Sequence, residues 1–284
     1  MARLSWFAGL PRVREVAAVA LAGSLALAGC AKKEAAVRVG FRPNAGATYR
    51  YEIKVQSTTT TNLGDAAPER SVDDVVLESR DTVLDSSPVA VRLQVQLIRQ
   101  GSPDRTFVVR FDRGAQLAGV EAVDGLPPDV LGSGGGFPEF LPAAATAPPD
   151  RPLAPGETWK IDASTAAGTA TGARLVGTGR LLKVMGAGDH KVASIKATTS
   201  LPLSSTSRLG DATVTLEGEE TTESTATRAL ADGAVEESSS VTKGTFRLSL
   251  NPKPGGQAQP VTGTMSVEIR SQTRRVPDEA GKKG

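Results

Sequence analysis

The strongest constraint on the fold of this chain is an alternation of apolar and polar residues with a period of two. Between Thr48 and Thr60, tyrosine, isoleucine and valine alternate with arginine, glutamate, lysine and glutamine. The alternation returns in three further segments, 71–84, 89–97 and 107–112. Because successive side chains of a strand point to opposite faces, each segment predicts a strand with one buried and one hydrated face.

A second set of strands is predicted after residue 158. The expected segments are 158–164, 172–186, 190–203, 211–230, 234–250 and 261–275. Asp232-Gly233 lies between two of them and is a strong signal for a tight hairpin, and Met185 to Asp189 is a second expected turn. We therefore predict an all-β, mainly antiparallel fold with few short helices. The strands form either one strongly curved sheet, that is, a half-barrel, or two related β half-domains.

A segment rich in proline and glycine separates the two sets of strands. Residues 124–155 hold eight prolines, together with the glycine-rich run from Gly132 to Gly136. This density excludes a long helix or a central strand, so we predict a connector with short helical turns near 126–131 and 138–141. The expected organisation is a signal helix in 1–29, a tether in 30–36, a first β half in 37–123, the connector in 124–155, a second β half in 156–276 and a flexible tail in 277–284.

The starts of the two halves resemble each other. Pro43-Asn44-Ala45-Gly46-Ala47-Thr48-Tyr49-Arg50 opens the first half, and Ala154-Pro155-Gly156-Glu157-Thr158-Trp159-Lys160 opens the second. Both read as a glycine turn followed by threonine, an aromatic and a basic residue. We interpret this as an internal duplication, although a glycine turn before an aromatic residue is also common at the start of unrelated strands.

The N-terminus has the three parts of a secretion signal. Three arginines precede an apolar run from Val16 to Leu27, which is shorter than the roughly 20 residues of a membrane span. Leu27-Ala28-Gly29-Cys30 follows and resembles the lipobox of bacterial lipoproteins. The resemblance implies acyl chains on Cys30 and cleavage before it. Two or more chains would anchor the protein stably to a membrane. The alternative is an ordinary signal peptide or anchor helix with an unrelated cysteine.

Charge and cysteine content exclude several classes of protein. Three arginines and one glutamate lie in residues 1–29, so the remainder holds 30 basic and 30 acidic residues. A neutral chain without a basic block does not indicate a nucleic-acid partner. Cys30 is the only cysteine, so no intramolecular disulfide can form and the fold depends on its own core.

The layout as a whole also resembles a known group of proteins. A Gly-x-Thr-Tyr-x-Tyr strand after the lipobox, a proline-rich middle, Pro155-Gly156-Glu157-Thr158-Trp159 and a late Asp-Gly hairpin are similar to uncharacterised bacterial lipoproteins. These are likened to the LolA/LppX-type half-barrel. The resemblance implies a concave apolar face that holds acyl chains. Helices cover this face in the half-barrel proteins, but no amphipathic helix is evident in this sequence.

Residues able to support catalysis or metal binding are few. His190 is the only histidine and lies in a polar turn, which predicts an exposed side chain, and one histidine cannot supply a zinc site. The acidic pairs Asp73-Asp74, Glu219-Glu220 and Glu236-Glu237 should point to opposite strand faces as solvated charges. The Gly132 to Gly136 run lacks the lysine of a phosphate loop. Gly177-Thr178-Gly179 indicates a bulge or a close backbone approach. Tyr49, Tyr51 and Trp159 either fill the core, which we favour, or line a pocket.

These observations predict a non-catalytic protein without a metal or cofactor, held outside the cytoplasm by acyl chains on Cys30. Ala31 after the cysteine favours the outer membrane in a Gram-negative cell; in a single-membrane cell the location is the outer face of the cell membrane. We weigh three functions. The first is a binding module for a lipid or another apolar ligand, the second an envelope structural or protein-interaction lipoprotein, and the third a carboxylate-dependent envelope hydrolase.

Overall fold

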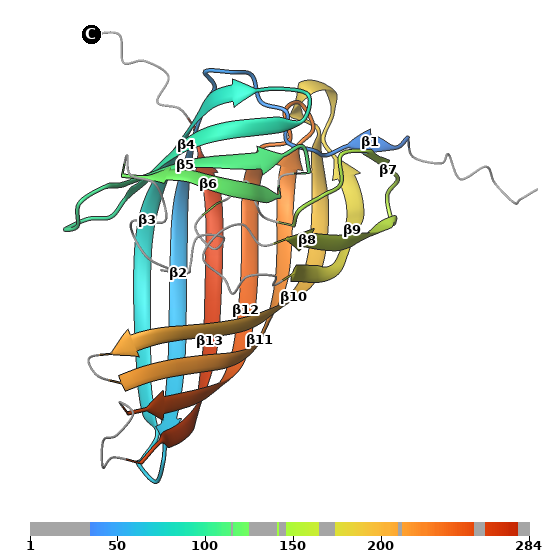
Figure 1. Ribbon diagram of the computed structural model, residues 1–284. Coiled ribbons are helices and arrows are strands. Elements are labelled where there is room, and N and C mark those ends of the chain that lie inside the picture. The colour runs from blue at the N-terminus through green and yellow to red at the C-terminus, as the bar shows by residue number, and fades with distance from the viewer. Residues whose placement is uncertain are drawn as a thin grey trace, which may run out of the picture. The chain divides into compact units, whose positions relative to one another are not determined.

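The computed structural model describes residues 35–114, 116–124, 141, 146–164, 174–209, 212–252 and 259–277. Figure 1 shows that these residues form antiparallel β-structure, as predicted. Within them, the helical element is a single 3-10 turn, η4 (Gly188–His190). No helix in this part of the chain is both long and apolar enough to cross a membrane.

The strands fall into two sets along the chain. The first set is β2 (Thr48–Leu63), β3 (Glu69–Ser86), β4 (Ala90–Ile98), β5 (Arg105–Asp112) and β6 (Leu117–Val123). The second set is β8 (Thr158–Ser164), β9 (Arg174–Met185), β10 (Val192–Leu209), β11 (Ala212–Ala229), β12 (Val235–Asn251) and β13 (Val261–Val276). Two short strands, β1 (Val37–Arg38) and β7 (Pro152–Leu153), pair with each other.

Both sets belong to one eleven-stranded sheet. Its order is β6-β5-β4-β3-β2-β13-β12-β11-β10-β9-β8, so each set is a meander in which consecutive strands are neighbours. The first strand of one set pairs with the last strand of the other, with β2 and β13 running antiparallel from Arg50↔Val276 to Gly263↔Leu63. In Figure 1 these two strands, blue and red, lie side by side in the middle of the sheet.

The two sets begin with the same turn. Gly46 and Gly156 have φ angles of 80° and 85°, a region that favours glycine. Ala47 donates to the carbonyl of Asn44 at 3.1 Å, and Glu157 donates to that of Ala154 at 2.9 Å. Each turn glycine then donates to the neighbouring strand, Gly46 to Val83 on β3 and Gly156 to Leu181 on β9. This shared geometry supports the predicted duplication.

Contacts between distant strands show that the sheet is curved. Phe41 donates to the carbonyl of Arg113, in the β5–β6 turn, and Arg42 donates to that of Asp232, in the β11–β12 turn. Five strands separate β5 from β11 in the sheet order. A two-residue segment can reach both turns only because the sheet curls around it.

The core lies on the concave face, which we call the inner face. One buried cluster centres on β2 to β5 and includes Tyr51, Leu93 and Phe111; the other centres on β8 to β10 and includes Trp159 and Ile195. The inner side chains of β2 are buried from Tyr49 to Val55 and half-exposed from Ser57 to Leu63. We call the part of the sheet level with the buried stretch of β2, Tyr49 to Val55, the core end. The part level with Ser57 to Leu63, into which the long strands continue, is the open end.

Several sequence-based boundaries change. The strand β6 was not predicted, and β10 ends at Leu209 instead of residue 203. Part of the predicted connector is packed against the sheet, because Leu153 is fully buried and the carbonyl of Ala147 accepts a hydrogen bond from Trp159. The predicted helical turn at 126–131 lies outside the described residues, as does most of the one at 138–141.

Candidate functional site

The residue that the sequence singled out, Cys30, lies outside the described residues, and so does the run from Gly132 to Gly136. His190 is exposed at the end of η4, as predicted. Glu219 is exposed and hydrogen-bonded to Ser200, while its neighbour Glu220 lies half-buried on the inner face. The two members of this acidic pair therefore occupy opposite faces, but only one of them is a fully solvated charge.

The large aromatics fill the core. Tyr49, Tyr51 and Trp159 are 3%, 2% and 6% exposed, so the interpretation as core residues is confirmed. A Cβ added at Gly179 would lie 2.1 Å from the Trp159 ring. Glycine at this position therefore allows the indole to lie flat on the neighbouring strand β9, a close approach of the kind that the sequence indicated here.

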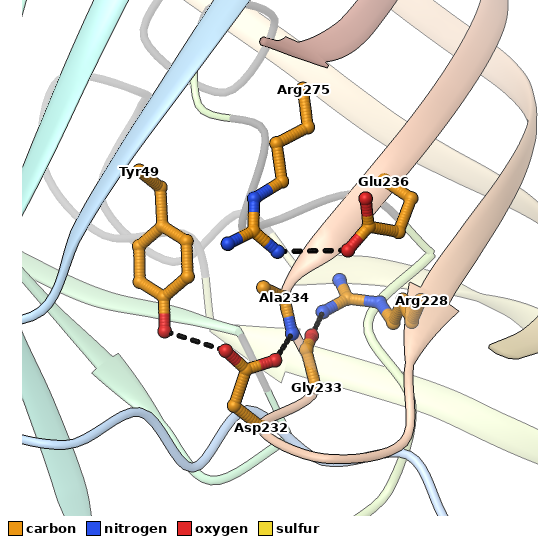
Figure 2. Close-up of polar contacts among 7 residues, drawn as sticks. All are labelled: Tyr49, Arg228, Asp232, Gly233, Ala234, Glu236 and Arg275. Carbon is orange, nitrogen blue, oxygen red and sulfur yellow. Dashed lines mark hydrogen bonds and ion pairs between the residues drawn. The ribbon is translucent and has the colours of Figure 1, made fainter. Parts of the chain in front are cut away.

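A partly buried polar cluster joins the Asp-Gly hairpin to the middle of the sheet (Figure 2). The Tyr49 hydroxyl donates to Oδ2 of Asp232 at 2.8 Å, and Oδ1 of Asp232 accepts from the Ala234 amide at 2.9 Å. Arg275 donates to Glu236 at 2.8 Å, and its guanidinium lies 4.9 Å from the centre of the Tyr49 ring. The cluster thus links β2, β13 and the β11–β12 turn.

Arg228 is the most deeply buried charge of this cluster. Its side chain is 0% exposed, and Nη1 donates to the carbonyl of Gly233 at 2.9 Å. Burial lowers the pKa of Arg228 to about 10, so the guanidinium remains charged at neutral pH. Burial also raises the pKa of Tyr51 and, with Asp232 as a second cause, that of Tyr49. Both tyrosines therefore stay neutral, and Tyr49 keeps the proton that it donates to Asp232.

Asp81 on β3 is a buried carboxyl group outside the polar cluster. It is 2% exposed and accepts a hydrogen bond of 2.5 Å from the Ser79 hydroxyl. Burial raises the pKa of Asp81 to about 7, and the Ser79 hydrogen bond opposes the rise only in part. A carboxyl group in this position carries its proton over much of the range below neutral pH.

The geometry of the polar cluster is structural. The side chains of Asp232 and Glu236 join the β11–β12 hairpin to Tyr49 of β2 and Arg275 of β13, and Arg228 donates to Gly233 within the hairpin. Sequence reasoning treated Glu236 as a solvated charge; the structure corrects this, because Glu236 is half-buried against Arg275. Sequence reasoning also missed Arg228. Its one signal was its position two residues after Ala226, which places both side chains on the same buried face of β11.

The open end presents a different surface on the same inner face. Nine of its side chains are half-exposed and apolar, and they are contributed by four adjacent strands. This apolar inner face consists of Leu201, Leu203, Val214, Leu216, Leu248, Leu250, Met265, Val267 and Ile269. The opposite face of these strands carries polar residues, including Glu217, Arg247 and Ser266.

Phe246 forms the centre of the apolar inner face. It is 2% exposed and pairs across strands with Met265 and Gly218. A Cβ added at Gly218 or Gly244 would lie 2.6 Å from the Phe246 ring, so the two glycines let the ring lie flat on the sheet. Glu220, on the same face, has its pKa raised by burial. The floor of the open end is thus apolar with one carboxyl beside its aromatic centre.

A hollow of about 440 Å³ lies beside the core end, between β3 and the β4–β5 turn. Its floor is Val75, Leu77 and Leu97, and its rim carries Arg99 and Arg105. The volume is within the usual range of small-molecule sites, roughly 300–1,000 Å³. Among the described residues, no group of three or more His, Cys, Asp or Glu side chains could hold a metal ion.

Comparisons with known proteins give no family. No family model matches, and no curated protein matches. Among solved structures, the outer membrane protein OprG from Pseudomonas aeruginosa is 10% identical, covering 85% of this chain and 100% of its own, with a TM-score of 0.25. OmpT of Vibrio cholerae is 9% identical, covering 84% and 99%, with a TM-score of 0.18. Similarities this weak carry no conclusion about this chain.

Proposed function

We propose that this protein is a lipoprotein outside the cytoplasm, tethered by acyl chains on Cys30, that binds a lipid or another apolar ligand on its inner face without catalysis. The observation that carries the proposal is the apolar inner face. Strands β10 to β13 place nine half-exposed aliphatic side chains on one surface. Monomeric proteins seldom leave a contiguous apolar surface of this kind without a binding role.

The non-catalytic part of the proposal is supported by the hydrogen bonds within the polar cluster. Tyr49, Asp232, Glu236 and Arg275 bond to one another or to the backbone of the hairpin beside them. Catalytic groups need a reacting partner within reach in a cleft. The apolar inner face, in contrast, offers one carboxyl, Glu220, amid aliphatic side chains, which fits retention of an apolar chain better than acid–base chemistry.

The ligand-binding proposal is tested by native mass spectrometry on residues 31–284 purified from cells. All strands described lie within Ala36–Gly284, which is a compact unit by itself. We expect a co-purified lipid-sized adduct, and we expect Val267→Asp to remove it. The matched control is Ser266→Asp, which places the same charge on the outer face of the same strand. Loss of the adduct in both variants, or no adduct in any sample, would contradict the proposal.

The anchor is tested separately, on the full chain in bacterial cells. Cys30→Ser removes the thiol that acylation requires. We expect the variant to remain unprocessed and to incorporate no labelled fatty acid, whereas the wild type incorporates it and fractionates with membranes. A Cys30→Ser protein that is cleaved and membrane-associated like the wild type would show that Cys30 is not the anchor.

A further inference from the structure

The hollow beside the β4–β5 turn combines an apolar floor with a cationic rim. Leu97 and Arg105 are cross-strand partners on the inner face, and Leu77 lies on the inner face of β3 next to them. Arg99 follows the end of β4, and Gly101, with a φ of 78°, lets the chain turn back so that Ser102 donates to the Arg99 carbonyl at 3.2 Å. The two arginines therefore flank one tight turn at the same rim.

Arg105 is held in place by its neighbours. Its Nε lies 2.5 Å from Oδ2 of Asp124, and Oδ1 of Asp124 accepts from the Thr106 amide at 2.8 Å. The guanidinium also lies 5.8 Å from the centre of the Phe107 ring. Because Asp124 engages Nε, the two terminal nitrogens are left on the far side of the planar group. A guanidinium fixed in this way can bind a second anion with both of these nitrogens.

Arg99 adds a second positive charge at the rim. Within the described part of the chain, no ion pair to Arg99 is formed, and its side chain is exposed. The nearest acidic residue on the inner face of β3 is Asp73, two positions beyond Val75 and exposed. Asp104 is held by Gln96 of the outer face, and Asp124 is engaged by Arg105, so on the inner side the rim keeps the positive charge of Arg99 over the apolar floor.

The floor of the hollow continues into the apolar inner face. Val75 on β3 pairs with Val55 on β2, and the next inner position of β2, Ser57, pairs with Ile269 on β13. Val75, Leu97 and Ile269 all pack partly exposed against the same buried cluster. Ile53, the partner of Leu77, and Ser57, the partner of Ile269, lie four residues apart on β2, roughly 13 Å, and two strand spacings separate β3 from β13, roughly 10 Å. The diagonal from the hollow to Ile269 is therefore close to the length of one acyl chain, about half of a ~30 Å bilayer core.

We infer that the ligand is a long-chain amphiphile with a single anionic headgroup, a fatty acid, whose carboxylate binds Arg99 and Arg105 while its chain crosses β3 and β2 toward Ile269 and Val267 on β13. The inference rests on the proposed function, because it names the ligand of the same inner face. Charge complementarity selects the headgroup: a carboxylate accepts hydrogen bonds from two guanidinium groups, whereas a neutral ester or alcohol gains no such ion pair.

The test compares a fluorescent polyene fatty acid with its methyl ester, each titrated into residues 31–284. We expect the acid to bind about tenfold more tightly than the ester, and added salt to weaken the acid alone. The double variant Arg99→Gln/Arg105→Gln should bind the acid about tenfold more weakly than the wild type does and should bind the ester with unchanged affinity. The matched control, Arg80→Gln/Arg110→Gln, removes the same charge from exposed outer-face positions and should bind both probes as the wild type does.

A variant that removes a negative charge should have the opposite effect on binding of the acid. Asp73→Asn removes the acidic residue nearest to the floor on β3 and should strengthen binding of the acid two- to threefold, on the order of one weak surface charge interaction. Equal binding of acid and ester, or equal losses in the two double variants, would overturn the anionic headgroup and leave the proposed function standing. Failure of both probes to bind would overturn the proposed function itself.

Discussion

The core end and the open end belong to the same strands, yet their inner faces differ in burial. On β13, Thr273 and Ser271 are buried, whereas Ile269, Val267 and Met265 are half-exposed. The more polar residues are thus the more buried. Burial in this sheet follows from what lies across the concave face, not from the polarity of the strand itself.

At the core end the opposite wall of the sheet supplies that cover. The segment at Phe41 and Arg42 bonds to the β5–β6 turn and to the β11–β12 turn, and Phe111 of β5 shares a buried cluster with Val235 of β12. Among the polar groups enclosed there, Ser79 bonds to Asp81 and Arg228 bonds to the Gly233 carbonyl, as expected of buried polar groups. The aliphatic side chains of the open end keep partial exposure, and this difference in burial is what distinguishes the two ends.

The largest expected effect is at the core end. Arg228→Ala removes a fully buried side chain and its hydrogen bond to the Gly233 carbonyl. We expect a loss of about 4 kcal/mol in the free energy of unfolding, since a cavity and an unsatisfied carbonyl are created together. Urea unfolding followed by the fluorescence of Trp159 measures it. The exposed control Arg247→Ala on β12 should change stability by no more than about 0.5 kcal/mol.

Asp81 should give the core end a pH dependence. Because its pKa is about 7 in the folded protein and 3.8 is the reference value, the folded state keeps a proton that the unfolded chain has lost between these values. Stability therefore falls as pH rises through this window, by about 3 kcal/mol between pH 5 and pH 8. Asp81→Asn should flatten this slope in urea unfolding. An unchanged slope would show that other groups cause it.

Matched leucine truncations compare the two ends directly. Leu93 is 0% exposed in the core, and Leu248 is half-exposed on the apolar inner face. We expect Leu93→Ala to cost about 3 kcal/mol and Leu248→Ala about 1 kcal/mol, because only the first leaves an enclosed cavity. Ligand affinity should respond in the opposite order, with Leu248→Ala weakening binding more. Equal stability losses would mean that the open end is as closely packed as the core.

The smallest expected effect is at the centre of the open end. A Cβ at residue 244 would meet the Phe246 ring at 2.6 Å, so Gly244→Ala must lift the ring from the sheet. We expect a loss of about 1 kcal/mol in stability, similar to other overpacked sites, and a measurable change in ligand affinity. Gly119→Ala, where an added Cβ meets no atom within 4 Å, is the control in the same urea unfolding assay.

Sequence patterns predicted most strands because period-two alternation is a local signal. The Asp232-Gly233 hairpin and the exposed turn at His190 were also local and were found. The order of the strands was not predicted, because the pairing of β2 with β13 depends on which strand edges meet in space. Strand β6 was missed since Leu117 to Val123 alternates poorly around Gly119.

The candidate site was predicted only in outline. A concave apolar face was expected by resemblance, and the alternation of Met265, Val267 and Ile269 indicated one apolar strand face. Neither showed that this face stays half-exposed, because exposure depends on the opposite wall of the sheet. The arginines of the hollow gave no sequence signal, since Arg99 and Arg105 resemble any charges flanking a turn.

The account is tested most directly by a methyl signal at the open end. The chain has three methionines, of which Met185 and Met265 follow the predicted signal. Residues 31–284 labelled with ¹³C in the methionine methyl groups are titrated with a long-chain fatty acid. The Met265 methyl, on the apolar inner face, should shift in proportion to occupancy, while Met185, beside the β9–β10 turn, stays in place. A shift at Met185 alone, or at neither methyl, would contradict ligand binding at the open end.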